Sequence, residues 1–253
     1  SAAASSWSYG GVNAGGSART TRTRRTLRPV LIRSWNVFHG RTFPVGRRVF
    51  LRELVEMVTS DRPDVVCLQE LPLWSLRQLE GWSGMRAEWA VARRTLVPWR
   101  LGKALQRLDP RRFRSGVTGQ ANAILLAPGL QLLEHHVTRV SDRGRERRVC
   151  HAVRLPGLVV GNVHATNDFR RPQIPREELK RAHALVEATA GPEDARVLAG
   201  DFNLRDPGLP GPNIDHIVVA GATHGRLEVW PEERRRHDGL VLSDHAPVEV
   251  RLG

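Results

Sequence analysis

The stretch Val197-Leu198-Ala199-Gly200-Asp201-Phe202-Asn203 is a short apolar run that ends in a carboxylate and a carboxamide. A second polar group, Ser243-Asp244-His245, lies close to the C-terminal end of the sequence. Short, nearly continuous apolar runs that end in polar residues are typical of buried β-strands. Because an α/β scaffold presents its chemistry at the rim of its sheet, we expect the polar ends of such runs to meet there.

Four further groups have the same form: Ser34-Trp35-Asn36-Val37, Leu68-Gln69-Glu70, Asn162-Val163-His164-Ala165-Thr166-Asn167 and Asn213-Ile214-Asp215-His216-Ile217. Their carboxylate and carboxamide oxygens, with no cysteine among them, favour Mg²⁺ or Mn²⁺ over zinc. A divalent cation combined with histidines and a carboxylate provides the catalytic groups that phosphodiester hydrolysis requires.

The composition predicts a packed globular protein. The chain has 253 residues, of which 40% are hydrophobic, and seven tryptophans, enough to bury a core. No long apolar run is present, so we expect no membrane span. Cys67 and Cys150 each sit inside an apolar segment, which predicts buried free thiols in a reducing compartment.

Residues 1–28 are rich in Ser, Ala, Gly, Thr and Arg and contain almost no apolar residues. Such a segment cannot bury a core, so we expect a disordered basic tail. It lacks the apolar centre of a secretory signal, and we therefore expect a cytoplasmic location. An arginine-rich leader of this kind also resembles an organelle transit peptide, so organelle targeting remains an alternative.

Alternating helix and strand patterns begin at Pro29, and we expect residues 29–253 to form one domain. The predicted helices cover residues 47–59 and 175–190. The predicted strands cover residues 30–35, 64–68, 86–92, 121–127, 130–137, 148–155, 158–163, 196–199, 216–219, 227–230 and 246–252. Many strands with few helices favour an α/β (α+β) fold, a four-layer sandwich of two packed mixed β-sheets with helices on the outer faces.

The net charge of +13 suggests a polyanionic partner. Residues 1–28 carry five arginines and no acid, and 13 minus 5 leaves +8 for the remainder. A basic surface attracts nucleic acid and speeds its arrival. Because nearly all of this charge is arginine, a surface that is merely solvated is the alternative.

Residues 93–114 hold eight basic residues against the single acid Asp109. Leu101, Ala104, Leu105 and Leu108 recur at the spacing of one helix face. This segment predicts either a basic wall that tracks a nucleic-acid backbone, with Trp99 and Phe113 available for stacking, or an amphipathic helix with a solvated basic side.

The ordered series Trp-Asn, Gln-Glu, Asn-Val-His, Gly-Asp-Phe-Asn, Ile-Asp-His and Ser-Asp-His resembles the motif pattern of the endonuclease/exonuclease/phosphatase superfamily. The resemblance extends from about Val30 to Leu252 and implies a deoxyribonuclease I-like or exonuclease III-like fold. Other members place either tyrosine or histidine at the position of His164. The only tyrosine here is Tyr9, so the chain resembles the histidine-bearing branch.

The resemblance also implies roles for individual residues. Glu70 is expected to be the main Mg²⁺ ligand, with Asn36 beside it and Asp244 supporting the first metal or holding a second. Asp201 would orient or deprotonate the attacking water, and Asn203 would hold that water or the phosphate in line.

The remaining expected roles concern the phosphate and the leaving group. His245 would donate to a non-bridging phosphate oxygen, and Asp215 would fix its tautomer and favour its charged form. His164 would act as general acid toward the leaving oxygen. Asn122 and Asn167 would contact the phosphate.

The pattern predicts a nuclease that hydrolyses DNA or RNA, acting as a monomer. The alternative is a phosphatase or phosphodiesterase of a small or lipid phosphoester, of the inositol phosphate or sphingomyelin type. Residues 200–205 match a run of inositol polyphosphate 5-phosphatases, but Gly-Pro-Asn-Ile-Asp-His replaces their Pro-Ala-Trp-x-Asp-Arg signature, which weakens that alternative. A non-catalytic binding module would have lost a catalytic residue, and none is missing.

Overall fold

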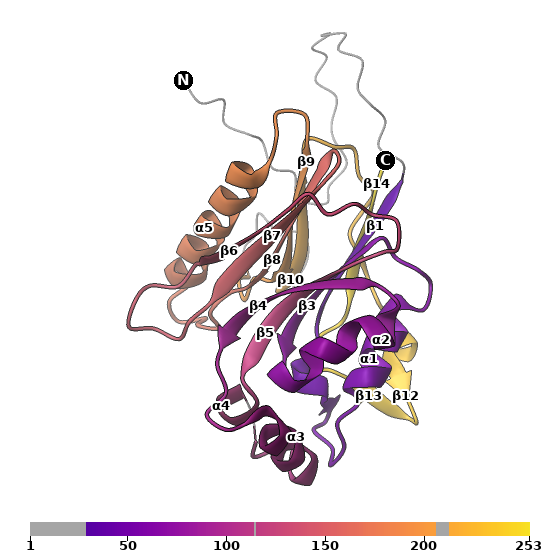
Figure 1. Cartoon of the computed structure of the whole chain (residues 1–253), viewed down its shortest axis with the longest axis vertical. Helices are drawn as coiled ribbons and strands as arrows, with labels where there is room; N and C mark the ends of the chain where they lie inside the picture. The colour runs from indigo at the N-terminus through magenta and orange to yellow at the C-terminus, as the bar shows by residue number, and fades with distance from the viewer. Residues whose placement is uncertain (1–28, 114, 206–212) are drawn as a thin grey trace.

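Two sheets packed face to face form the centre of the computed structural model, which describes residues 29–113, 115–205 and 213–253 (Figure 1). The tail expected over residues 1–28 lies outside the described residues. The six-stranded sheet has the order β11-β14-β1-β3-β5-β4 and the five-stranded sheet the order β10-β9-β8-β7-β6. A small third sheet has the order β12-β13-β2. The first two sheets are mixed, as predicted, because β1 pairs in parallel with β3 and β8 with β9.

The strands have the following bounds. The six-stranded sheet contains β1 (Val30–Asn36), β3 (Val65–Leu71), β4 (Arg86–Arg93), β5 (Gln120–Leu126), β11 (Glu228–Val229) and β14 (Val248–Leu252). The five-stranded sheet contains β6 (Glu134–Arg139), β7 (Val149–Leu155), β8 (Leu158–His164), β9 (Ala195–Asp201) and β10 (Asp215–Ala220). The small sheet contains β2 (Thr42–Phe43), β12 (Arg236–His237) and β13 (Leu240–Leu242).

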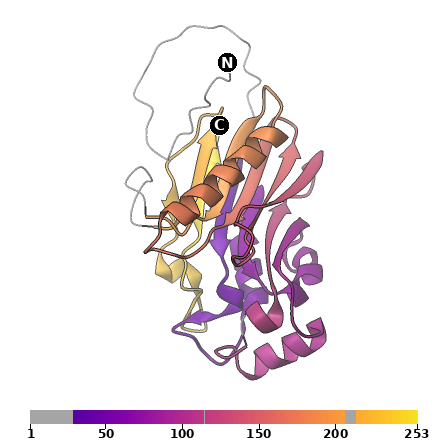
Figure 2. The same ribbon diagram turned by 90° about the vertical axis from the view of Figure 1, so that its left-hand side faces the viewer.

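Helices cover the outer faces of both large sheets, which confirms the four-layer sandwich (Figures 1 and 2). On the six-stranded sheet, Val55 and Val58 of α1 (Leu51–Thr59) and Leu79 of α2 (Leu79–Ser83) share one buried cluster with strand residues. On the five-stranded sheet, Ala182 and Val186 of α5 (Gln173–Thr189) do the same.

The remaining helical segments are α3 (Trp99–Leu108), α4 (Ser115–Thr118), η1 (Phe38–Gly40), η2 (Leu73–Gln78) and η3 (Glu232–Arg235). Among the described helices, none combines the length and the apolar character needed to cross a bilayer. Cys67 and Cys150 are free and buried, as predicted.

Several predicted bounds were wrong. The strand expected over residues 130–137 begins only at Glu134, the helix expected from residue 47 begins at Leu51, and the strand expected over residues 227–230 covers two residues. Apolar residues at the ends of these segments pack without joining a helix or a ladder; Leu130 and Leu132, for example, pack against the core between the sheets. Periodicity alone cannot distinguish this packing from pairing.

The layer between the sheets changes from apolar to polar along the strands. Inward-facing residues at one end, such as Ile32, Val65 and Val160, belong to a single buried apolar cluster. Because side chains alternate along a strand, every second residue faces inward. Toward the other end of the strands, these inward-facing residues are polar. They are Ser34 and Asn36, Gln69, Gln120 and Asn122, Asn162 and His164, Asp201 and Asp215, all of them buried.

Gln69 and Asn162 join the two sheets where this change occurs. The Gln69 amide donates to Asn162 Oδ1 at 2.9 Å, and the Asn162 amide donates to the carbonyls of Leu68 at 3.0 Å and Ala123 at 2.8 Å. Neither side chain is exposed. Since buried polar groups are costly when unpaired, this bridge fixes how the sheets lie against each other.

Replacing Asn162 by leucine should therefore lower the free energy of unfolding by about 2–4 kcal/mol, since at nearly constant volume it takes the side-chain donor from two buried carbonyls and one of the acceptors from the Gln69 amide. Urea unfolding measures this loss. The matched control is Asn167→Leu, the same change at an exposed position, with an effect of about 0.5 kcal/mol or less. Equal stabilities of the two variants would contradict the role assigned to the bridge.

Candidate active site

The strand registers bring the predicted residues together at one rim of the sandwich. In the five-stranded sheet, Asp201 lies opposite His164 on one side and Asp215 on the other. From the six-stranded sheet, Asn36 Nδ2 donates to Asp201 Oδ2 at 2.9 Å across the gap between the sheets. Two sheets therefore build one cluster, with Asp201 near its centre.

Asp215 and His245 form a tight pair. His245 Nδ1 lies 2.7 Å from Asp215 Oδ2, and His245 Nε2 lies 3.8 Å from Asp201 Oδ2. Burial alone would lower the pKa of His245, but the charge and hydrogen bond of Asp215, with the charges of Asp201 and Asp244, raise it to about 10. The imidazole is therefore protonated and positive at neutral pH.

The loop that carries His245 is tied to β1. Trp35 Nε1 donates to the carbonyl of His245 at 2.9 Å. The hydroxyl of Ser243, which is fully buried, donates to the carbonyl of Asn36 at 2.7 Å and accepts from the backbone N–H of His245 at 3.1 Å. These bonds hold the imidazole at a defined place over the rim.

Asp201 is a buried carboxylate with several partners. Besides Asn36, it accepts the backbone N–H of Asn203 at 3.0 Å. Burial raises the pKa of Asp201 well above its usual range, and the charges of Asp215 and Glu70 act in the same direction. A carboxyl with a raised pKa is a stronger base than an ordinary aspartate, which suits it to receive a proton from water.

Asn203 lies two residues after the end of β9 and has a left-handed backbone, with φ of 48°. Its amide donates to the carbonyl of Ala165 at 3.0 Å, which fixes the side chain. Within the described residues, Asn203 Oδ1 and Asp215 Oδ1 are buried without a hydrogen-bond partner. Since orphaned buried acceptors are rare, these two atoms are suited to a ligand or a water.

Glu70 reaches the cluster through a break in β3. The pairing of β3 with β5 shifts between Leu68 and Leu71, and Glu70 has φ of 57°. Irregularities of this kind re-aim a side chain that regular alternation would point elsewhere. Glu70 then lies 3.4 Å from His39 Nε2 and 3.8 Å from His164 Nε2.

His164 differs from His245 because two hydrogen-bond donors lie against its ring. Gln120 Nε2 lies 3.0 Å from its Nδ1, and Arg148 Nη1 lies 3.2 Å from the same nitrogen. Arg148 Nη1 also lies 3.3 Å from Nε2, whereas the Gln120 amide contacts Nδ1. The Gln120 donor therefore favours the tautomer in which Nδ1 accepts and Nε2 carries the hydrogen, facing Asp201 Oδ2 at 3.5 Å. Burial, followed by the charge of Arg148, lowers the pKa of His164 well below its usual range.

Asp244 lies at the edge of the same cluster. Asp244 Oδ1 lies 3.9 Å from His245 Nε2, and burial, with a contribution from the charge of Glu70, raises the pKa of Asp244. Among the described residues, Asp201, Asp215 and His245 each offer an atom that could ligate a metal, and these atoms lie within 4.8 Å of one another. A protonated imidazole has no lone pair to offer, so we interpret this trio as an acid–imidazole arrangement.

Two predicted residues lie apart from these contacts. Asn122 is buried on β5, one inward position beyond Gln120, and its amide donates to the carbonyl of Val149 at 3.3 Å. Asn167 is exposed on the loop between β8 and α5. Their contact with phosphate stays a prediction.

Sequence reasoning assigned no role to His39, Gln120 or Arg148. His39 follows the Trp-Asn motif directly, and Gln120 opens the strand that holds Asn122, so proximity to motifs was a usable signal for both. Arg148 gave no signal, because one arginine at the start of a strand is inconspicuous in this arginine-rich chain.

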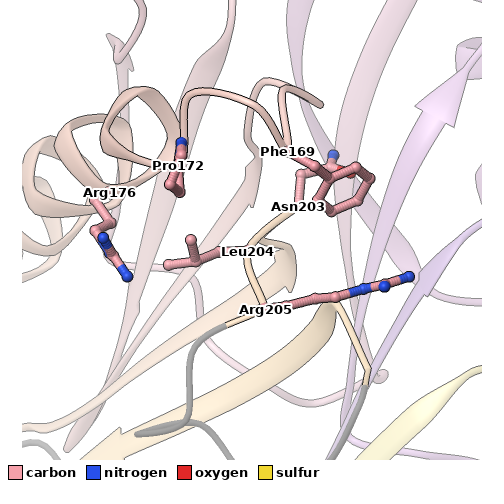
Figure 3. A pocket seen from close by; sticks show the side chains of 6 residues that line it. All are labelled: Phe169, Pro172, Arg176, Asn203, Leu204 and Arg205. Atoms are coloured by element: carbon pink, nitrogen blue, oxygen red, sulfur yellow. The ribbon is translucent and has the colours of Figure 1, made fainter.

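A small pocket adjoins the cluster at Asn203 (Figure 3). It is lined by Phe169, Pro172, Arg176, Asn203, Leu204 and Arg205. The two arginines come from different segments, α5 and the chain after β9, and Arg205 lies 5.2 Å from the centre of the Phe169 ring. The pocket therefore combines positive charge with one aromatic face.

Solved structures share this fold. A TDP2 structure from Caenorhabditis elegans superimposes with a TM-score of 0.63 at 15% identity, covering 92% of this chain and 76% of that one. An endonuclease/exonuclease/phosphatase from Beutenbergia cavernae gives 0.64 at 16% identity, with 89% and 72% covered. A mannosyl-6-phosphatase from Bacteroides thetaiotaomicron gives 0.61 at 15% identity, with 88% and 99% covered.

No curated protein matches the sequence. The model of the Endonuclease/Exonuclease/phosphatase family, however, matches residues 34–245, which span the cluster from Asn36 to His245. The chain therefore belongs to the endonuclease/exonuclease/phosphatase family.

Proposed function

We propose that this protein is a divalent-metal-dependent phosphodiesterase that hydrolyses nucleic acid by in-line attack of an activated water. The observation that carries the proposal is the meeting of His245, His164 and the buried carboxylate of Asp201 at one rim, where both imidazoles lie within 4 Å of that carboxylate. Their surroundings raise the pKa of His245 and lower the pKa of His164. Membership of the family supports phosphoester hydrolysis as the class of reaction.

The carboxylates of the rim suit a hard cation, Mg²⁺ or Mn²⁺. The charge of Glu70 raises the pKa of both Asp201 and Asp244, which shows that these acids repel one another. A bound cation would relieve that repulsion and supply charge neutralisation at the phosphate. We assign Glu70 as its main ligand, with Asn36 and Asp244 contributing oxygens.

Asp201 and Asn203 would prepare the attacking water. The raised pKa of Asp201 lets its carboxylate take a proton near neutral pH, and the Asn36 amide holds the carboxylate in place. The orphaned Asn203 Oδ1 lies next along the chain and would accept a hydrogen bond from the same water. Together the two side chains would align its lone pair with the phosphorus.

His245 would stabilise the charge that builds on the phosphate. Its Nδ1–H is directed at Asp215, so its Nε2–H is free to donate to a non-bridging oxygen. Because the imidazole is already positive, the donation gains from charge as well as from hydrogen bonding.

His164 would act on the leaving oxygen by hydrogen bonding. A general acid must first be protonated, whereas burial and Arg148 keep this imidazole neutral. Its Nε2–H can still donate to the oxygen as negative charge develops there. We therefore propose a donor role in place of the general acid that the resemblance implied.

The pocket beside Asn203 favours a polymeric substrate. Arg176 and Arg205 would bind a phosphate next to the scissile one, and Phe169 offers a face for a base. A small monoester would leave these groups unused. The alternative, a small or lipid phosphoester, draws its support from the exposed apolar side chains of α3, which are described below.

Turnover on a substrate panel tests the function: supercoiled plasmid, single-stranded DNA, RNA and bis-p-nitrophenyl phosphate, each with Mg²⁺ and with EDTA. We expect metal-dependent cleavage of at least one polymer. Cleavage of the small diester alone would support the alternative, a small or lipid phosphoester as substrate. No cleavage of any substrate would contradict phosphodiesterase activity.

Replacing Asp215 by asparagine should shift the pH dependence of kcat/KM. The wild-type His245 stays protonated until about pH 10, so this group causes no loss as the pH rises from about 6 to 9. Without the charge of Asp215, its pKa should fall toward 6.5 or below, and activity should decline through neutral pH. Asp238→Asn, at an exposed turn, is the control and should keep the wild-type profile. An unshifted profile in Asp215→Asn would contradict the charged role of His245.

Replacing Asp201 by asparagine should reduce turnover at least about a hundredfold. Stability should behave differently. A carboxyl whose pKa is raised on folding costs stability at any pH above that raised value, so the neutral variant should unfold at the same temperature or higher at pH 8 to 9. Calorimetry and single-substrate kinetics check both expectations. Near-normal turnover would overturn the proposed base.

A further inference from the structure

Helix α3 is attached to the protein by its polar side. Gly102 and Gln106, which lie one turn apart, are the two residues that it buries. Gln106 Oε1 accepts from Trp74 Nε1 at 2.8 Å, and Gln106 Nε2 donates to the carbonyl of His39 at 2.9 Å. Removing a carboxamide from two buried hydrogen-bond partners costs free energy, so these bonds determine which side of the helix faces the protein.

The apolar side of α3 consequently faces away from the core. Leu101 is 48% exposed, Leu108 is 78% exposed and Trp99, at the helix start, is 50% exposed. Leu96, just before the helix, is 79% exposed. Isolated leucines on a surface need no explanation, but Leu101 and Leu108 lie two turns apart on one exposed face of the helix, and Leu96 and Trp99 add two more exposed apolar side chains at its start. Such a concentration of apolar side chains marks an interaction site.

Positive charge surrounds this patch, which we call the α3 patch: Leu96, Trp99, Leu101 and Leu108. Exposed arginines lie on both sides of it in sequence, namely Arg93, Arg94, Arg100, Arg107, Arg111 and Arg112. The single acid of this segment, Asp109, accepts the backbone N–H groups of Arg111 and Arg112, and Glu146, from another part of the chain, lies 3.9 Å from Arg93. A second copy of the chain would bring arginines against arginines, so the complementary partner is anionic.

We propose that the α3 patch binds the surface of an anionic lipid bilayer. Such a surface supplies an apolar phase for the leucines and phosphates for the arginines, and tryptophan favours the boundary between the two. A nucleic acid would satisfy the arginines but has no apolar phase to receive Leu96, Leu101 and Leu108. Membrane binding goes beyond the proposed function and does not depend on it.

The position of α3 fits contact with a flat surface. In both views it lies at the outer end of the molecule (Figures 1 and 2). Its Gln106 holds the carbonyl of His39, and the His39 ring lies 3.4 Å from Glu70. The helix therefore stands beside the rim that carries the candidate active site.

Sedimentation with sucrose-loaded vesicles tests the proposal on the full chain, using phosphatidylcholine alone and phosphatidylcholine mixed with phosphatidylglycerol. We expect binding to the anionic vesicles, weakened about tenfold or more in Leu101→Asp. The matched control is Leu133→Asp, at a leucine of equal exposure (45%) beyond β5, which should bind like the wild type. Circular dichroism and melting temperature verify that both variants are folded.

Arg107→Gln should reduce the preference for anionic over neutral vesicles. The basic residues 1–28 are present in every variant, so differences between variants report on α3 alone. Asp201→Asn should bind vesicles like the wild type whatever its turnover, which separates this proposal from the proposed function.

Three results would overturn the proposal: no binding to anionic vesicles, equal binding by Leu101→Asp and Leu133→Asp, or unchanged lipid preference in Arg107→Gln. Weaker oligonucleotide binding by Arg107→Gln, together with unchanged vesicle binding by Leu101→Asp, would assign the segment to nucleic acid instead.

Discussion

The amide bridge between Gln69 and Asn162 divides the space between the sheets into an apolar part and a polar part. On one side of it, valines and isoleucines of both sheets exclude water. On the other side, the same inward-facing positions carry Asn36, His164, Asp201 and Asp215. Because the bridge fixes the relative position of the sheets, the Asn36–Asp201 hydrogen bond can form with a length of 2.9 Å. The site thus depends on a contact that takes no part in its chemistry.

Neighbouring histidines acquire opposite properties from their surroundings. His245 faces acids, above all Asp215, whereas His164 faces the donors Gln120 and Arg148. Both rings lie within 4 Å of Asp201. Environments that push the pKa values of two like groups apart suit one residue type to two roles, and the proposed roles are a cationic donor for His245 and a neutral donor for His164.

The sequence was sufficient to predict the four-layer fold and most of the cluster, because short, nearly continuous apolar runs that end in polar residues define both the strands and the rim. It could not predict how Glu70 enters the site, since that depends on a break in the pairing with β5. The contact of Arg148 with the site could not be predicted either, because it joins Arg148 to His164, 16 positions away in the sequence. Such contacts are set by register, which a single sequence leaves open.

The outward apolar face of α3 was also beyond prediction. The leucine spacing correctly indicated an amphipathic helix, and the usual inference places its apolar side against the core. Here two hydrogen bonds of Gln106 determine the orientation instead. Burial of one well-paired carboxamide therefore outweighs the pattern of four apolar residues.

The pairing of β1 with β14 has a consequence for synthesis of the protein. Residues 30–34 form their ladder with residues 248–252, so a growing chain cannot complete the six-stranded sheet until residue 252 has left the ribosome. His245, which β14 follows almost directly, emerges only shortly before. The first strand must therefore wait for more than 200 further residues before its ladder with β14 can form, and the candidate site lacks His245 until nearly the same point.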